Sequence, residues 1–204
     1  MHSELILPIS PIPPIPFFSQ AAFAEKTIVD GEENYVKQTV RNRYFILGSN
    51  GVLALTIPVL GQQGKKVRTK DIEIDYSKPW LRLHLRSLEA AYRSAPFYDH
   101  YIDPITKILS TPHNNLSDFF TASFPAWLAL LRLDLPWEMS KEYLEPRNSF
   151  DLRETIKSPD RFPAWIHAHR YEQVFSDRFP FIPHLSVPDL LFNEGPAAAR
   201  ILLA

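Results

Sequence analysis

The 204-residue sequence contains no cysteine and no apolar run of 18 residues. The lack of cysteine excludes disulfides, thiolate catalysis and every cysteine-ligated zinc or iron–sulfur site. The lack of a long apolar run argues against a membrane-spanning helix. The GxGxxG, GxSxG, HExxH and Walker motifs of nucleotide-binding proteins, serine hydrolases and zinc proteases are also missing. We therefore expect no cofactor.

Two histidines form the only pattern with metal-ligand spacing. His167 and His169 would share one face of a strand, an arrangement that suits metal ligation. Glu172 is the only carboxylate within five residues of the pair. A pair of surface histidines is the simpler interpretation, and we predict no metal site.

Charge is unevenly distributed along a chain whose composition is otherwise ordinary for a folded protein. Hydrophobic residues make up 45% and charged residues 22%, and the length predicts one domain over residues 1–204. The net charge of −1 lacks the basic signature of a nucleic-acid-binding protein. Residues 35–100, however, contain eleven Lys or Arg against five Asp or Glu, a net of +6. The positive charge of residues 35–100 predicts a site for an anionic ligand. The alternative is a solvent-exposed face whose charges bind no ligand.

Proline is the overrepresented residue, and five of the 19 prolines fall between Pro8 and Pro16. Proline lacks an N–H and fixes φ, so this stretch cannot be a helix or a central strand. We expect a stiff loop after a short strand at residues 5–7, and the alternative is a polyproline segment that binds a protein partner. The N-terminus does not resemble a signal peptide, so the cytoplasm is the default compartment.

The first half of the chain reads as strands with one helix. A strand at 5–7, a helix at 17–24 and a strand at 27–29 form a βαβ outline, which favours parallel pairing. Apolar runs at 44–47 and 52–59 flank Asn50-Gly51, the signature of a hairpin with a type I′ turn. Alternation over 71–76 predicts a half-exposed strand.

After Ser77 the apolar residues recur at helical spacing, and Ser77 itself is a candidate N-cap. Helices are predicted from there to Pro96, over 97–109, and over 117–131, where Pro125 should kink or split the helix. Residues 134–163 are weakly patterned, and a short helix is predicted over 196–203. The fold class is therefore α/β (mixed α+β), with a small N-terminal βαβ-like sheet, a hairpin, a mainly helical middle and a loop-rich C-terminal part.

Two parts of the sequence contain candidate functional residues. The segment Glu32–Arg43 offers cations, amides and carboxylates just after the second strand, where ligands bind in open α/β sheets. The alternative there is a hydrated connection with ordinary salt bridges. His84 shares a helical stripe with Trp80, Leu88 and Tyr92, so it is either a hydrogen-bonded core residue or a proton carrier facing a cavity. We predict a mostly buried His84, with one ring nitrogen facing a cavity that also reaches Arg41 or Arg43.

Five segments also occur in a family-specific order. After the N-terminal strand, proline-rich loop and aromatic helix start, the sequence reads Tyr35-Val36-Lys37-Gln38-Thr39-Val40-Arg41-Asn42-Arg43, then Leu55-Thr56-Ile57-Pro58-Val59, then Trp80 through His84 to Tyr92 and Pro96-Phe97. This order resembles the WbqC-like protein family, and the tail from Tyr171 to Pro196 resembles its Bacteroidetes form. Two departures are the absence of an aromatic residue in Ile9–Ile15 and the presence of His184 before Leu185.

The resemblance implies a role in O-antigen or surface-polysaccharide biosynthesis, by transfer of a glycyl or other small acyl group to an amino sugar or sugar nucleotide. It implies that His84 is the catalytic base and that the substrate is bound by Tyr35, Lys37, Gln38, Arg41, Asn42 and Arg43. Lys37, Arg41 and Arg43 would hold a diphosphate or carboxylate. Gln38 and Asn42 would donate to an oxyanion. The alternative is a non-catalytic binding or scaffold protein whose partner surfaces are the proline-rich N-terminus and the tail Asp189–Pro196.

Overall fold

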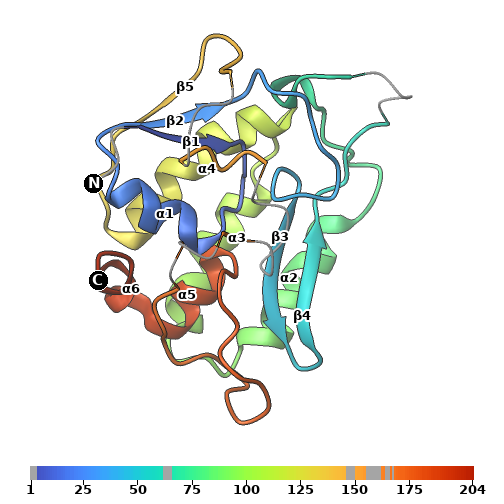
Figure 1. Ribbon diagram of the computed structural model, residues 1–204. Coiled ribbons are helices and arrows are strands. Elements are labelled where there is room, and N and C mark those ends of the chain that lie inside the picture. Colours follow the sequence, from blue (N-terminus) through green and yellow to red (C-terminus); the bar gives the residue numbers. More distant parts are fainter. Residues whose placement is uncertain (1–3, 62–65, 146–149, 155–161, 164–165, 167) are drawn as a thin grey trace.

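The computed structural model describes residues 4–61, 66–145, 150–154, 162–163, 166 and 168–204. It shows the predicted mixed α+β class, with a small parallel sheet near the N-terminus, a β-hairpin and helices between and behind them (Figure 1). Within the described residues, no helix is long and apolar enough to cross a membrane.

The predicted parallel pairing is confirmed. Strand β1 (Leu5–Pro8) leads through α1 (Ile15–Ala22) to β2 (Thr27–Asp30), and the two strands pair in parallel with Leu7 opposite Val29. A third strand, β5 (Trp137–Met139), pairs in parallel with the other side of β2. Sequence reasoning missed β5 because three residues in a weakly patterned stretch carry no periodicity. Both β1 and β2 are buried on both faces, as is typical of strands in a parallel sheet.

The proline-rich loop between β1 and α1 lies inside the protein. Every residue from Ile9 to Pro14 is buried, and the carbonyl of Pro11 accepts hydrogen bonds from Trp127 Nε1 and Ser123 Oγ. A proline has no N–H to satisfy, so burying this loop leaves few unpaired backbone donors. The expectation that this segment presents a surface to a protein partner does not fit the fold.

The hairpin consists of β3 (Arg43–Gly48) and β4 (Gly51–Thr56), paired antiparallel. Its type I′ turn was a wrong prediction, because Gly51 has a positive φ of 104° and Asn50 does not. The outer edge of β3 is covered, since Phe45 accepts a hydrogen bond from the backbone of Ser186. The far edge of β4 is open, and Val52 and Leu53 on it are exposed.

The helical middle follows the prediction with local differences. Helix α2 (Trp80–Tyr92) and helix α3 (Tyr98–Ser110) lie where expected, and α4 (Leu116–Leu131) continues through Pro125 without splitting. Ser77 is not a cap, because its hydroxyl donates to Asp75 and Pro79 occupies the N-cap. Residues 71–76 form isolated bridges after a 3₁₀ turn (Thr69–Asp71) rather than a strand.

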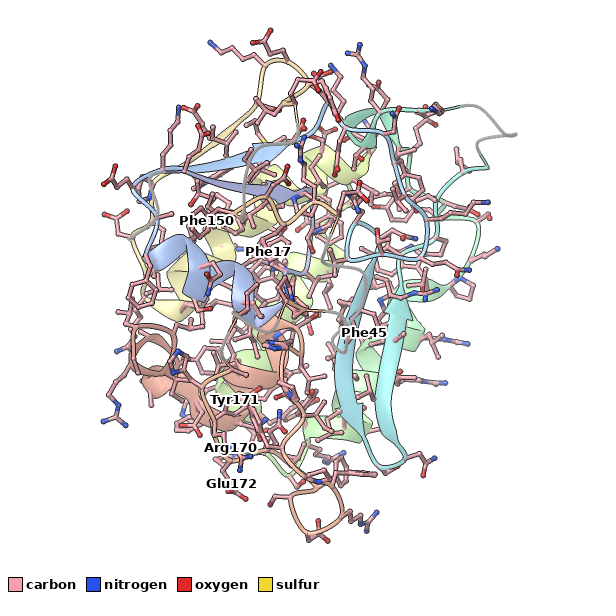
Figure 2. All side chains as sticks on the ribbon, in the orientation of Figure 1. Phe17, Phe45, Phe150, Arg170, Tyr171 and Glu172 are labelled. Carbon is pink, nitrogen blue, oxygen red and sulfur yellow. The ribbon has the colours of Figure 1, made fainter. Side chains whose placement is uncertain are left out.

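The core is built around α4. Phe124 stacks on Phe18 of α1 at 5.5 Å and meets Trp137 of β5 edge-on at 5.2 Å. Phe17 of α1 and Phe45 of β3, both labelled in Figure 2, are buried as well.

The C-terminal part contains a helix that sequence reasoning missed. Helix α5 (Val187–Glu194) is followed by a 3₁₀ turn (Gly195–Ala197) and by α6 (Ala198–Leu202), which corresponds to the short helix predicted there. Asp189 is fully buried and accepts hydrogen bonds from Tyr92 and Tyr171. Most of the tail Asp189–Pro196 is therefore interior, and it is not the partner surface that the scaffold hypothesis assigned to it.

Candidate functional site

The polar block and the histidine meet at Thr56, the last residue of β4. Arg43 Nε donates to Thr56 Oγ1 at 3.0 Å, and the ring of His84 is hydrogen-bonded to the Thr56 backbone. The pairing of β3 with β4 places Arg43 opposite Thr56, and α2 packs against the same hairpin. Local strand register thus brings two predicted site residues to a common neighbour.

His84 is buried as predicted, with 1% of its surface exposed. Its ring lies edge-on to the rings of Tyr44 and Trp80, at centroid distances of 5.3 and 5.0 Å. Burial lowers the pKa of His84 to about 4, and the hydrogen bond to the Thr56 backbone opposes this shift. The imidazole is therefore neutral at pH 7 and is a weak base.

A pocket of about 540 Å³ lies between α2 and β4, and His84 and Trp80 belong to its wall. Arg41 and Arg43 do not line it, so the predicted cavity shared with them is wrong. Its cations are Lys78, which lies just before α2, and Arg82 and Arg86 on α2. The remaining lining residues are Ala54, Leu55, Thr56, Pro58, Pro79 and Leu83.

The described side chains around the pocket mouth carry positive charge without a matching negative charge. Lys78, Arg82 and Arg86 are exposed, and none of them forms a salt bridge within the described part of the chain. The lining residues include no carboxylate. Nitrogen-tipped side chains extend from the α2 side past the open edge of β4 (Figure 2). This arrangement favours an anionic ligand.

Arg41 lies elsewhere and is engaged by the protein itself. Its side chain is fully buried and donates to both carboxylate oxygens of Glu33, at 2.7 and 2.5 Å. It also donates to the carbonyl of Arg153 at 2.9 Å and to Thr39 Oγ1. Desolvation raises the pKa of Glu33, and the Arg41 cation opposes the shift. Arg41 is thus a structural residue rather than a ligand-holding cation.

The same conclusion applies to the whole carboxyl edge of the parallel sheet. Asp30, at the end of β2, is fully buried and accepts from Arg153 and from Ser140 Oγ. Arg153 is also paired with Asp151. This edge is where open α/β sheets often bind ligands, but here internal ion pairs fill it. Glu33 and Arg41 therefore form an ordinary salt bridge, which was the alternative to a ligand site in the segment Glu32–Arg43.

The remaining members of the predicted block are dispersed. Lys37 and Gln38 are exposed on a turn, and Gln38 has a left-handed φ of 61°. Tyr35 is half-buried, and burial raises its pKa to about 12. Asn42 is buried and donates through Nδ2 to the carbonyl of Ile57, the neighbour of Thr56. Only Asn42, Arg43 and His84 therefore approach the Thr56 region.

The interface between α2 and β3 holds a concentration of unpaired polar atoms. Within the described residues, seven buried side-chain polar atoms have no hydrogen-bond partner in the protein. Three of them lie at this interface, namely Tyr44 OH, Trp80 Nε1 and His84 Nδ1, and Asn42 Oδ1 belongs to the residue just before β3. Each would cost about 1–3 kcal/mol if left dry, and the four would together cost about 4–12 kcal/mol. That total is comparable with the whole stability of a domain, so we expect these atoms to bind water or a ligand.

Sequence reasoning missed Tyr44 and the polar role of Trp80. A tyrosine in an apolar strand and a tryptophan on a buried helical stripe both read as core residues. Only the spatial contact of both rings with His84 distinguishes them from ordinary packing.

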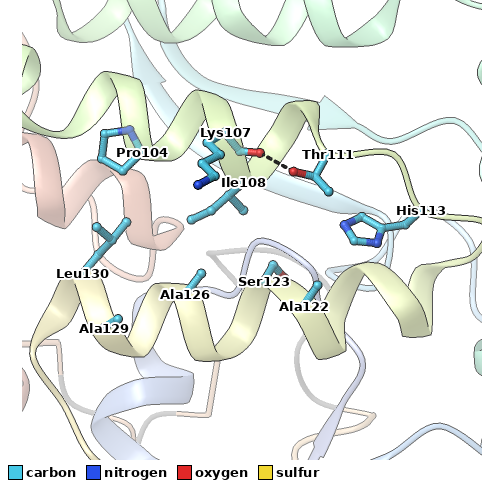
Figure 3. Close-up of a pocket in the computed structure, with 10 residues that line it drawn as sticks. All are labelled: Pro104, Lys107, Ile108, Thr111, His113, Ala122, Ser123, Ala126, Ala129 and Leu130. Atoms are coloured by element: carbon cyan, nitrogen blue, oxygen red, sulfur yellow. Dashed lines mark hydrogen bonds between the residues drawn. The ribbon is translucent and has the colours of Figure 1, made fainter.

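A second hollow lies between α3 and α4 (Figure 3) and has a volume of about 350 Å³. Its floor is made of small side chains, including Ala122, Ala126 and Ala129, and Lys107 is the one Lys or Arg among its described lining residues. The buried unpaired atoms lie elsewhere. His167, one of the two histidines with metal-ligand spacing, lies outside the described residues.

Comparison with known proteins identifies the family. The model of the WbqC-like protein family matches residues 10–158, which is more than half of the chain. The chain belongs to the WbqC-like protein family. The predicted resemblance to the family is thereby confirmed, the resemblance of the tail to a Bacteroidetes form stays a prediction, and the match includes every described lining residue of the α2–β4 pocket.

One curated relative of this WbqC-like chain is the uncharacterized protein Rv1507c of Mycobacterium tuberculosis (strain ATCC 25618 / H37Rv). The two are 32% identical over 104 residues, which are 50% of this chain and 44% of the relative. The chain thus matches less than half the length of that relative. No solved structure matches.

Proposed function

We propose that this WbqC-like protein binds a nucleotide-activated amino sugar in the α2–β4 pocket and transfers a small acyl or aminoacyl group, such as glycyl, to its amine. The role in surface-polysaccharide biosynthesis comes from the family resemblance. The observation that carries the proposal is a pocket with a buried neutral histidine in its wall and three exposed cations at its mouth that form no salt bridge with any described residue. Activated sugars are cytoplasmic metabolites, so this proposal also places the protein in the cytoplasm.

Phosphate recognition is assigned to α2. Arg82 and Arg86 are one helical turn apart, and Lys78 lies just before the helix. Arginine binds phosphate oxygens through two parallel N–H bonds, and lysine adds a point charge. These residues replace Lys37 and Arg41 in the diphosphate-binding role that the resemblance implied.

His84 is the proposed base. The sugar amine attacks the carbonyl carbon of an activated ester or thioester, the C–N bond forms, and the amine becomes acidic. His84 accepts the released proton and passes it to the leaving oxygen or sulfur as the C–O or C–S bond breaks. A pKa of about 4 suffices for this step because the proton comes from a cationic adduct rather than from a neutral amine.

The binding step is tested by calorimetry with UDP- and dTDP-amino sugars. Replacing both Arg82 and Arg86 by alanine should weaken the affinity at least about tenfold, from the loss of two charge-assisted contacts. Arg93→Ala is the matched control, because Arg93 caps the C-terminus of α2, pairs with Glu89 and does not line the pocket. Wild-type protein that binds no member of the panel would contradict the proposal.

A non-catalytic binding protein is the second candidate. It is favoured by the weak basicity of His84 and by the exposed apolar side chains of Val52, Leu53 and Leu83 near the pocket. Mass spectrometry separates the two functions. An acylated sugar formed in the presence of an activated acyl donor supports the enzyme, and ligand binding without product supports the binding protein.

A further inference from the structure

Three buried rings, those of Tyr44, Trp80 and His84, form a cluster behind the cationic mouth of the pocket, and Asn42 adds a fourth buried polar side chain from the residue just before β3. Trp80 and His84 lie one turn apart on α2 and line the pocket, and the ring of Tyr44 contacts that of His84. Asn42 precedes Tyr44 by two residues and is hydrogen-bonded to Ile57, next to the pocket residue Thr56. All four residues are at most 5% exposed, and each has one polar atom without a protein partner among the described residues.

The free atoms of this cluster combine donors and acceptors. Trp80 Nε1–H only donates, and Asn42 Oδ1 only accepts. Tyr44 OH does both, and His84 Nδ1 accepts when the proton of the neutral ring is on Nε2. An anion needs donors alone and an ammonium group needs acceptors alone. A hydroxyl group, which donates and accepts, matches the set.

We propose that Asn42, Tyr44, Trp80 and His84 form a hydroxyl-binding subsite that selects the sugar ring of the ligand. Lys78, Arg82 and Arg86 hold the anionic end at the mouth, and the subsite binds the uncharged, hydroxylated end. Tyr44 and Trp80 are then specificity-determining residues. The identity of the ligand rests on the proposed function, and water, which shares the chemistry of a hydroxyl group, occupies the same positions in the free protein.

The first experiment needs no ligand and measures the melting temperature of Tyr44→Phe. If the Tyr44 hydroxyl is hydrogen-bonded to water in the subsite, its removal lowers Tm by a few degrees. Tyr92→Phe is the matched control, because the buried Tyr92 hydroxyl has two protein partners, Leu47 N and Asp189. A Tyr44→Phe protein whose Tm is unchanged or raised overturns the subsite, since a dry, unpaired hydroxyl destabilises the fold and its loss stabilises it.

The second experiment compares UDP with UDP-glucosamine by calorimetry. We expect Tyr44→Phe and Trp80→Phe to weaken UDP-glucosamine binding at least tenfold and to change UDP binding less than twofold. Equal losses for both ligands, or no loss for either, overturn the assignment of sugar selection. Wild-type protein that binds neither ligand overturns the proposed function and the sugar assignment together, and the melting experiment alone then decides whether the subsite binds water.

Discussion

Two regions of this molecule bury polar side chains, and they do so in opposite ways. At the carboxyl edge of the parallel sheet, Asp30, Glu33, Arg41 and Arg153 satisfy one another through ion pairs. At the interface of α2 and β3, Tyr44, Trp80 and His84 are equally buried, yet each has an atom without a protein partner. A fully paired network serves the fold, whereas an unpaired one is prepared for a ligand or for water.

The largest effect is expected from breaking the paired region. Arg41→Met leaves the Glu33 carboxylate buried without its cation, and the free energy of unfolding should fall by about 3–5 kcal/mol. Urea denaturation measures the loss. The double variant Arg41→Met/Glu33→Leu should recover much of it, because an apolar pair replaces the buried ion pair. A single variant with wild-type stability would mean that Arg41 does not serve the fold.

The exposed cations of the pocket beside the unpaired region should matter for binding rather than for stability. Replacing Arg82 and Arg86 by alanine removes exposed cations, so Tm should stay within about 2 °C of the wild type. Affinity for a UDP-amino sugar should fall tenfold or more, as described above. Loss of affinity accompanied by a similar loss of stability would remove the contrast between the two regions.

The two regions also differ in how far the sequence predicted them. The parallel pairing, the hairpin and the buried stripe of α2 follow from local periodicity, and they were confirmed. The pairing of Arg41 with Glu33 agrees with the salt-bridge alternative, but the contact of Arg41 with the carbonyl of Arg153 was not predictable, because the two residues are 112 positions apart. The pocket cations were not identified from the sequence, because helical periodicity does not show that β4 lies beside Arg82 and Arg86.

The pH dependence of stability should report the buried state of His84. Its pKa is about 4 in the folded protein against 6.5 when exposed, so protonation favours the unfolded chain. The part of the folding stability that depends on a neutral His84 is fully present above pH 6.5 and is lost as the pH falls toward 4. Between pH 7.5 and pH 5, the wild type should lose about 2 kcal/mol more than His84→Gln does. Parallel pH profiles of the two proteins would show that His84 is not buried in the neutral form.

The smallest effect concerns the hairpin that carries Tyr44. Gly51 has a φ of 104° and open space around its Cα, so Gly51→Ala should cost about 1 kcal/mol of stability through backbone strain alone. Gly61→Ala is the control, because Gly61 also has open space but no positive φ. Equal stabilities of the two variants, measured by thermal melting, would argue against the turn geometry described here.

The most direct test of the contrast between the two regions is a high-resolution crystal structure determined with and without UDP-glucosamine. The account predicts an oxygen atom, from water or from the sugar, within about 3.2 Å of Tyr44 OH, Trp80 Nε1 and His84 Nδ1. It also predicts phosphate density beside Arg82 and Arg86, with the Arg41–Glu33 pair unchanged. Ligand density at the carboxyl edge of the parallel sheet, with Arg41 released from Glu33, would contradict it.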